Sequence, residues 1–177
     1  MKLIILDRDG VINYDSDQYI KSPAEWKPIP GSPEAIARLT QHGWRIVVAT
    51  NQSGIGRGLF DMATLNAMHN KMHRIVNQAG GRIEAVFYCP DTDAAKSWCR
   101  KPNPGMYHAI AERYNLPLTD VPAVGDSLRD LQAADAVGAQ PILVMTGKGR
   151  KTRAEGGFPE RTRIASDLAE VAEMLCQ

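Results

Sequence analysis

Residues 2–13 read KLIILDRDGVIN, and this stretch decides the fold. Its first five residues are mostly branched and apolar, which predicts a short strand buried on both faces. The strand ends at two carboxylates, Asp7 and Asp9, followed by Gly10. Ligands bind at the carboxyl ends of strands in an open α/β sheet, so D-x-D-G here indicates a hard metal ion and a carboxylate nucleophile. Taken alone, the motif is equally well explained as a turn in which both acids accept backbone N–H bonds.

The composition is that of an ordinary globular chain. It has 177 residues, 44% of them hydrophobic, and a formal net charge of +1. One domain spanning residues 1–177 can therefore bury a full core. The near-neutral charge gives no electrostatic footprint for nucleic acid or for an anionic membrane. Three cysteines are too few for the disulfide framework of a secreted protein, and there is no signal-peptide pattern or membrane-spanning run. We expect a cytoplasmic protein that acts as a monomer.

Strand-like and helix-like patterns alternate along the chain. Apolar runs predict strands over residues 2–6, 45–49, 83–88, 121–124 and 141–145. Helical patterns are predicted over residues 32–43, 61–80, 105–114, 128–137 and 167–175. This alternation predicts a central parallel sheet covered on both faces, a Rossmann-like three-layer α/β/α sandwich.

Three further segments carry polar or charged residues next to predicted strands or helices. Thr50–Gly58 (TNQSGIGRG) follows a predicted strand and offers hydroxyl, amide and backbone donors to a phosphate. Arg100–Gly105 (RKPNPG) holds two cations in a turn restricted by prolines. Val124–Asp130 (VGDSLRD) places another acid, Asp126, at a strand end, where it suits Mg²⁺. Each one alone is also explained as a flexible glycine loop, a solvated cation pair or a helix N-cap.

In this order, the four segments resemble the haloacid dehalogenase (HAD) superfamily of phosphotransferases over essentially the whole chain. More narrowly, Asp7–Asn13, Thr50–Gly54 and Cys99–Pro102 resemble the subgroup of heptose 1,7-bisphosphate 7-phosphatases and histidinol-phosphate phosphatases. The resemblance implies a Mg²⁺-dependent phosphomonoester hydrolase that acts on a small-molecule sugar phosphate through an aspartyl phosphate. Heptose bisphosphate, a precursor in ADP-heptose and lipopolysaccharide core biosynthesis, is the leading substrate, and histidinol phosphate is the alternative.

The resemblance also assigns roles to individual residues. Asp7 would be the nucleophile, and Asp9 would be the general acid and base. Mg²⁺ would be held by the Asp7 carboxylate, the Asp9 backbone carbonyl and Asp126. Thr50 and Lys101 would bind oxygens of the reacting phosphate. Further substrate contacts are expected from the two phosphate-binding turns, at Asn51, Gln52, Ser53, Arg57 and Arg100.

The segment between Asp7 and Thr50 is too short for the helical cap domain of larger HAD relatives. We therefore expect a minimal cap, made by the loops at residues 13–26, 54–59 and 89–98. The last of these departs from the subgroup, whose members hold a structural zinc there through a Cys-x-His and a Cys-x-Cys pair. Two of the four ligands are replaced here, and serine is a poor zinc ligand. We expect no zinc, with Cys89, Asp91 and Cys99 as the degenerate remnant of the site.

The remaining polar residues are less informative. A basic cluster after the last core strand contains Lys148, Arg150, Lys151 and Arg153. We expect it to be a solvated loop, with binding of a second phosphate as the alternative, because it lies near the site's side of the sheet. Surface or interface positions are expected for the four histidines, His42, His69, His73 and His108. The resemblance implies that Asp130 orients Lys101 or a metal-bound water. A catalytically silent phosphate-binding regulatory protein is an alternative of a different class, although every matched catalytic residue is present.

Overall fold

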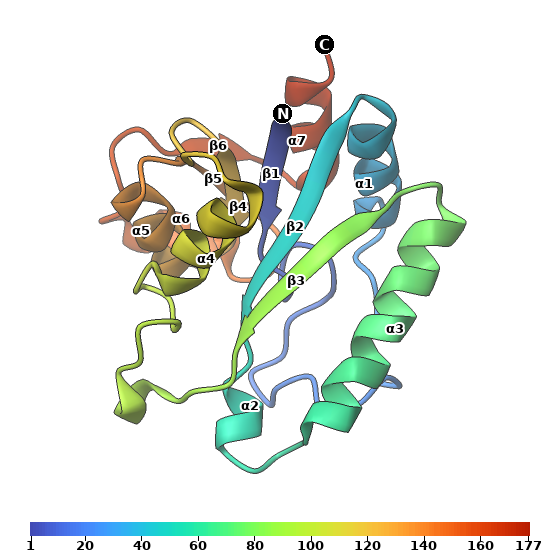
Figure 1. The fold of residues 1–177 in the computed structure, drawn as a ribbon, viewed down its shortest axis with the longest axis vertical. Helices are drawn as coiled ribbons and strands as arrows, with labels where there is room; N and C mark the ends of the chain where they lie inside the picture. The colour runs from blue at the N-terminus through green and yellow to red at the C-terminus, as the bar shows by residue number, and fades with distance from the viewer.

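The computed structural model describes all 177 residues as an open six-stranded sheet flanked by helices (Figure 1). Neighbouring strands are parallel throughout, in the order β3-β2-β1-β4-β5-β6. The strands are β1 (Lys2–Leu6), β2 (Trp44–Asn51), β3 (Ile83–Cys89), β4 (Pro122–Gly125), β5 (Gln140–Val144) and β6 (Arg163–Ala165). The strand order reverses between β1 and β4, which creates the switch point where doubly wound sheets bind ligands.

Helices lie on both faces of the sheet. They are α1 (Ser32–Gln41), α2 (Ser53–Gly56), α3 (Met62–Gln78), α4 (Gly105–Tyr114), α5 (Leu128–Ala136), α6 (Gly149–Glu155) and α7 (Leu168–Leu175), with a 3₁₀ turn, η1, at Asp93–Ala95. No helix combines the length and the apolar character that crossing a membrane requires.

The central strand β1 alternates its side chains between two cores. Ile4 and Leu6 pack into a cluster with apolar residues of α1, α3 and α7. Leu3 and Ile5 pack into a second cluster with residues of α4 and α5. All four side chains are buried, and each contributes about 1.5–3 kcal/mol of burial free energy. The predicted three-layer α/β/α sandwich with a parallel sheet is confirmed.

The register of the sheet brings three strand ends together. Leu6 is paired with Val48 of β2 on one side and with Val124 of β4 on the other. The backbone N–H of Asp7 continues the second ladder by donating to the Val124 carbonyl oxygen over 2.9 Å. Because the strands are parallel, the residues that follow them emerge at the same edge. Segments distant in sequence thereby meet at one site.

The loop between β1 and α1 contains no helix and no strand of the sheet. Ile20 and Trp26 anchor it by burying their side chains in the core. From α3, the Lys71 ammonium donates to the carbonyl oxygens of Pro23 and Trp26 over 2.7 and 2.6 Å. These contacts hold the loop over the carboxyl edge of the sheet, where it forms part of the roof expected from the sequence.

Three short elements, α2, α6 and β6, are not predicted by the sequence pattern. β6 is a three-residue strand in a charged stretch, too short for an alternation signal. The basic cluster from Lys148 to Arg153 is largely solvated, as expected, but it is not a loop, because most of it forms helix α6. β2 also continues beyond its predicted end at Ala49, as far as Asn51.

Candidate active site

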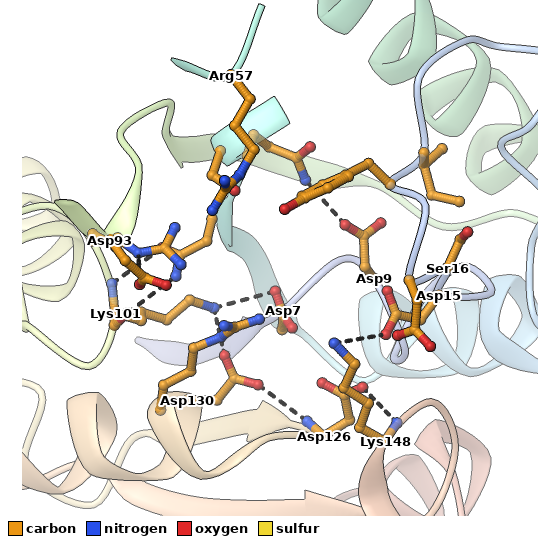
Figure 2. Close-up of a pocket in the computed structure, with 18 residues that line it drawn as sticks. Asp7, Asp9, Asp15, Ser16, Arg57, Asp93, Lys101, Asp126, Asp130 and Lys148 are labelled. Carbon is orange, nitrogen blue, oxygen red and sulfur yellow. Dashed lines mark hydrogen bonds and ion pairs between the residues drawn. The ribbon is translucent and has the colours of Figure 1, made fainter. Parts of the chain in front are cut away.

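A polar pocket opens at the carboxyl ends of β1, β2 and β4 (Figure 2). Only two of its 18 lining residues are hydrophobic, which indicates a charged or strongly hydrogen-bonding ligand. Most of the site residues expected from the sequence line it: Asp7, Asp9, Asn51, Gln52, Ser53, Arg57, Arg100, Lys101 and Asp126. Thr50 lies beneath the lining, and its hydroxyl accepts a 2.9 Å hydrogen bond from the Gln52 amide.

Lys101 is the cation at the floor of the pocket. Its ammonium lies 3.2 Å from Asp7 and 2.8 Å from Asp130, and it donates to the Ala49 carbonyl oxygen over 2.8 Å. The side chain is only 1% exposed. Burial disfavours the charged ammonium, but Asp130 and Asp7 outweigh this effect and raise the pKa of Lys101 above its usual range. Lys101 therefore stays charged next to the predicted nucleophile.

The carboxylates around Lys101 outnumber the available cations. Burial and the charge of Asp130 raise the pKa of Asp7 to about 7, despite the opposing effect of Lys101. Burial, Asp130 and Asp7 also raise the pKa of Asp126 well above its usual range. Burial acts in the same direction on Asp130, but Lys101 outweighs it and holds the pKa of Asp130 low. The site thus favours an additional positive charge beside Asp7 and Asp126.

The arrangement of oxygens fits a magnesium ion. Carboxylate oxygens of Asp7, Asp126 and Asp130 lie within 4.8 Å of one another. Asp130 is already committed, because its Oδ1 pairs with Lys101 and its Oδ2 accepts three hydrogen bonds from Asp126 and Ser127. Asp7 and Asp126 each keep one oxygen without a protein partner, which leaves a hard, all-oxygen donor set.

Two glycines make room for the Asp126 carboxylate. A Cβ atom at Gly10 or at Gly147 would collide with it, and both residues have positive φ angles, of 86° and 57°. The backbone N–H of Lys148 donates to Asp126 Oδ2 over 2.9 Å. This close packing explains why the second aspartate of the D-x-D motif is followed directly by glycine.

Asp9 has an environment very different from that of Asp7. Its Oδ1 accepts hydrogen bonds from Arg8 Nε, Arg8 Nη2 and Asn13 Nδ2, over 3.0, 2.8 and 2.8 Å. Its Oδ2 accepts one bond, of 3.2 Å, from the Gln52 amide. Arg8 in turn contacts His69 from helix α3. The expected surface position of His69 is wrong, because this side chain is buried against Arg8.

Asn51 joins the two turns that the sequence predicts to bind phosphate. Its Nδ2 donates to the Lys101 carbonyl oxygen, and its Oδ1 accepts from the Lys101 backbone N–H, each over 3.1 Å. Both ends of the amide are therefore engaged in holding Lys101 in place. The substrate contact expected of Asn51 would compete with these two bonds, which gives this residue a structural task that the sequence pattern does not reveal.

Further from Asp7, the pocket lining contains both cations and acids. Arg100 is largely buried, and its guanidinium donates to Asp93 Oδ1 and to the Asp91 carbonyl oxygen over 2.7 and 3.1 Å. Arg57 lies 5.7 Å from the ring centre of Tyr19. The sequence pattern does not single out several lining residues, namely Asp15, Ser16, Asp17, Tyr19 and Arg129, whereas Lys148 belongs to the basic cluster noted above. Only Arg129 carried a usable signal, because it lies within the motif that contains Asp126.

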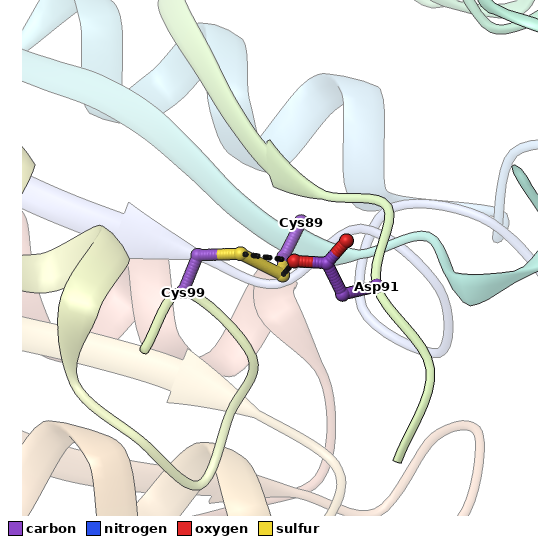
Figure 3. A group of neighbouring side chains, drawn as sticks. All are labelled: Cys89, Asp91 and Cys99. Atoms are coloured by element: carbon purple, nitrogen blue, oxygen red, sulfur yellow. Dashed lines mark hydrogen bonds between the residues drawn. A yellow bond between two sulfur atoms is a disulfide. The ribbon is translucent and has the colours of Figure 1, made fainter. Parts of the chain in front are cut away.

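The expected zinc remnant forms a separate cluster in the loop after β3 (Figure 3). Cys89 and Cys99 are joined by a disulfide bond, which the cysteine count did not predict. Asp91 Oδ2 lies 3.9 Å from the Cys89 sulfur and 3.6 Å from the Cys99 sulfur, and the Ser97 hydroxyl lies 3.5 Å from each. Sulfurs bonded to each other are not thiolates, so this cluster offers one carboxylate as its only anionic ligand.

Comparisons with known proteins agree on the relationship. Residues 98–171 match the HAD-hydrolase-like family. The chain is 63% identical to D-glycero-beta-D-manno-heptose-1,7-bisphosphate 7-phosphatase of Bordetella bronchiseptica, with 100% of this chain and 99% of that protein covered. It is 57% identical to the enzyme of the same name from Pseudomonas putida, with 99% of each covered.

Solved structures give the same result. A crystal structure of the B. bronchiseptica D,D-heptose 1,7-bisphosphate phosphatase, complexed with magnesium and phosphate, superposes with a TM-score of 0.98 over 99% of this chain and 98% of that one. The corresponding enzyme of Burkholderia thailandensis is 56% identical, with a TM-score of 0.80 over the whole of both chains. The chain therefore belongs to the HAD-like hydrolases and, within them, to the D-glycero-D-manno-heptose 1,7-bisphosphate 7-phosphatases, a family of phosphoric monoester hydrolases.

Proposed function

We propose that this protein removes the 7-phosphate of D-glycero-D-manno-heptose 1,7-bisphosphate in a Mg²⁺-dependent reaction, within the synthesis of ADP-heptose for the lipopolysaccharide core. The observation that carries the proposal is the group formed by Asp7, Lys101 and Asp126 at the switch point of the sheet. It combines a carboxylate nucleophile, a buried cation and a ligand for a divalent ion in one pocket. The relatives that match over the full length bear the name of this activity.

The proposed chemistry begins with Asp7. Its carboxylate attacks phosphorus, the bond to the leaving sugar oxygen breaks, and an aspartyl phosphate forms. Mg²⁺, held by Asp7, Asp126 and the Asp9 backbone carbonyl, would neutralise phosphate charge so that an anionic nucleophile can approach. The magnesium and phosphate complex of the B. bronchiseptica relative supports this metal assignment. Lys101 stabilises the charge on the phosphate oxygens in the transition state.

Asp9 is proposed to move the proton. It protonates the leaving sugar oxygen in the first step and then takes a proton from the water that hydrolyses the aspartyl phosphate. Asp9 lies two residues after Asp7 and lines the same pocket. Gln52 donates to both Asp9 and Thr50, so the turn after β2 is tied to the proton-transferring group.

The outer cations suit a second phosphate. Besides Lys101, four cations line the pocket: Arg57, Arg129, Arg100, which is paired with Asp93, and Lys148, which is paired with Asp15. Arg57 and Arg129 have no carboxylate partner in the structure, so they are free to pair with a second phosphate, whereas histidinol phosphate would offer an ammonium group instead. These two cations favour the heptose bisphosphate over histidinol phosphate. We also propose that the protein acts in the cytoplasm as a monomer.

Steady-state phosphate release, with and without Mg²⁺, tests the proposal. Heptose 1,7-bisphosphate should be the preferred substrate in a panel that includes histidinol phosphate and p-nitrophenyl phosphate. Phosphorus NMR of the product should show the 1-phosphate retained. Release of the 1-phosphate first, or a higher kcat/KM for histidinol phosphate, would overturn the substrate assignment.

A further inference from the structure

Arg8, between the two catalytic aspartates, has a role that the proposed mechanism does not use. We propose that Arg8 and His69 are positioning residues that fix the Asp9 carboxylate so that its Oδ2 carries the transferred proton. The inference rests on the proposed function, in which Asp9 is the general acid. It assigns a task to two residues outside the pocket lining.

Arg8 is a buried cation that does not face the substrate. Its side chain is fully buried, and it is absent from the residues that line the pocket. A buried guanidinium is costly unless its charge and its N–H groups are paired. Arg8 meets this requirement through Asp9 Oδ1, to which Nε and Nη2 both donate, over 3.0 and 2.8 Å. Both donors converge on the same oxygen, so this two-point contact holds Oδ1 in place and leaves Oδ2 facing the pocket side of the carboxylate.

The two oxygens of Asp9 are consequently unequal. Oδ1 accepts three hydrogen bonds, because Asn13 adds a third donor at 2.8 Å. An oxygen that already accepts three N–H groups has no free lone pair for a proton. Oδ2 accepts a single 3.2 Å bond from the neutral Gln52 amide. A proton on Asp9 therefore belongs on Oδ2.

His69 completes the support from helix α3. Its Nε2 lies 3.2 Å from Arg8 Nη1. A guanidinium has no acceptor, so Nη1 donates and the His69 ring must be neutral, with Nε2 as the acceptor. Burial, followed by the positive charge of Arg8, lowers the pKa of His69 to about 3, in agreement with a neutral ring. With Nε2 engaged by a cation, His69 is not available to bind a metal ion through that nitrogen.

The contact between Arg8 and His69 joins residues 61 positions apart in sequence. It links the turn after β1 to the first half of α3, so the helix acts as a rigid support for the proton-transferring group. Two substitutions at position 69 separate this role from simple packing. His69→Gln keeps an acceptor oxygen near the position of Nε2, whereas His69→Leu keeps bulk without an acceptor. His73→Leu, one turn further along α3, is the matched control because His73 makes no hydrogen bond to this network.

Leaving-group dependence is the decisive readout, because a general acid matters most when the departing oxygen is basic. The experiment compares kcat/KM of the Mg²⁺-loaded enzyme for phenyl phosphate and for p-nitrophenyl phosphate, which have nearly the same shape. We expect His69→Leu to lose roughly tenfold on phenyl phosphate and much less on p-nitrophenyl phosphate, the size expected for one lost hydrogen bond to a charged group. His69→Gln should stay within about twofold of the parent on both esters, and His73→Leu should do the same.

Arg8→Lys extends the test, because it keeps the charge but removes the two-point contact, and it should show the same selective loss. Inhibition by inorganic phosphate should be unchanged in each variant, which shows that the site is assembled. Equal losses on the two esters, or no advantage of His69→Gln over His69→Leu, would overturn the inference.

Asp9→Asn in the same assay separates the two proposals. If Asp9→Asn lacks leaving-group dependence, the acid role of Asp9 fails and the inference fails with it. If Asp9→Asn shows the dependence and His69→Leu does not, only the inference fails.

Discussion

The molecule contains two clusters of metal-binding side chains, and they differ in almost every physical respect. Asp7, Asp126 and Asp130 come from the ends of two central strands and the start of α5, and Asp7 and Asp130 both pair with one buried cation, Lys101. Cys89, the last residue of β3, and Cys99, in the loop that follows, are bonded to each other, with Asp91 beside them. The carboxylate cluster has an excess of negative charge, whereas the sulfur cluster has given up its thiolates.

The two clusters bring potential metal ligands equally close together, but they do not offer a cation the same charge. In the carboxylate cluster, the deficit of positive charge appears in the raised pKa values of Asp7 and Asp126. A divalent cation would relieve that deficit. In the sulfur cluster, the two sulfurs are bonded to each other, and the neighbouring cation, Arg100, is paired with Asp93. We therefore expect substitutions in the first cluster to affect chemistry and those in the second to affect substrate selectivity or nothing at all.

The largest effect is expected for Asp7→Asn. The amide keeps the size of the side chain but is not an anionic nucleophile, so kcat should fall by at least about a thousandfold. Asp91→Asn is the matched change in the sulfur cluster, and it should keep kcat within about twofold, as expected for a change that breaks no buried network. Initial rates of phosphate release from heptose bisphosphate measure both variants. Substantial turnover by rigorously purified Asp7→Asn protein would contradict the covalent mechanism.

A smaller, selective effect is expected for Arg100→Ala, next to Cys99. A charge-assisted contact to phosphate is worth about 1.5–3 kcal/mol, so kcat/KM for the bisphosphate should fall roughly ten- to a hundredfold. p-Nitrophenyl phosphate should be affected less, because it has no second phosphate. The exposed Asp93 carboxylate loses its partner at little cost in stability. Equal losses on the two substrates would instead place Arg100 at the reacting phosphate.

The carboxylate cluster could be predicted from the sequence because its signals are local. Asp7 and Asp126 each follow a short apolar run, and parallel strands bring such positions to one edge. The fold was predictable for the same reason, since the alternation of strands and helices is carried by short windows. β6 and α6 were missed because a three-residue strand and a charged, seven-residue helix have no periodicity to detect.

The contacts that support the site could not be predicted from the sequence. Each of them joins two segments that are far apart in the chain, and each depends on how these segments and their side chains are oriented in the folded protein. The 3.2 Å contact between Arg8 and His69 depends on which face of α3 is turned toward β1. The tie from Asn51 to the Lys101 backbone spans 50 positions in the chain. In the sequence, Arg8 is one more charged residue in a polar turn, and nothing there shows that it is buried.

The stability of the protein should depend on pH through its carboxylate cluster. The pKa of Asp7 is raised from 3.8 to about 7, so between these values the folded, metal-free protein holds more protons than the unfolded chain. Its stability should therefore fall as pH rises through this window. Mg²⁺ competes with these protons, so it should stabilise the protein more at about pH 8 than at about pH 5. At a hundred times its Kd the gain is about 2.7 kcal/mol, or roughly 5–10 °C in Tm.

Thermal unfolding at the two pH values, with and without Mg²⁺, measures this coupling. Asp126→Asn is the control, since it removes one of the two carboxylates with a free oxygen and should abolish most of the Mg²⁺ effect at high pH. A shift in Tm that is the same at both pH values would show that protons and Mg²⁺ do not compete for the carboxylate cluster.

The smallest effect is expected from zinc removal. A zinc-selective chelator should leave both activity and Tm unchanged when Mg²⁺ is in excess, and elemental analysis should find far less than one zinc per chain. About one tightly held zinc, lost together with the fold, would contradict this expectation. The loop also allows a positive control for this experiment, a variant in which the missing zinc ligands are restored. Two thiolates on a tetrahedral zinc are about 3.8 Å apart, given Zn–S bonds of about 2.3 Å.

In the loop, the Asp91 carboxylate and the Ser97 hydroxyl lie 3.5–3.9 Å from the sulfurs of Cys89 and Cys99. These four separations are close to those of a tetrahedral ligand set, and reduction of the disulfide would free the two sulfurs to take up the remaining spacing. The double substitution Asp91→His and Ser97→Cys supplies one imidazole and one thiolate at these places. Under reducing conditions this variant should bind about one zinc per chain, while the parent protein should not. Failure of the variant to bind zinc would mean that the two clusters differ in geometry as well as in ligand type.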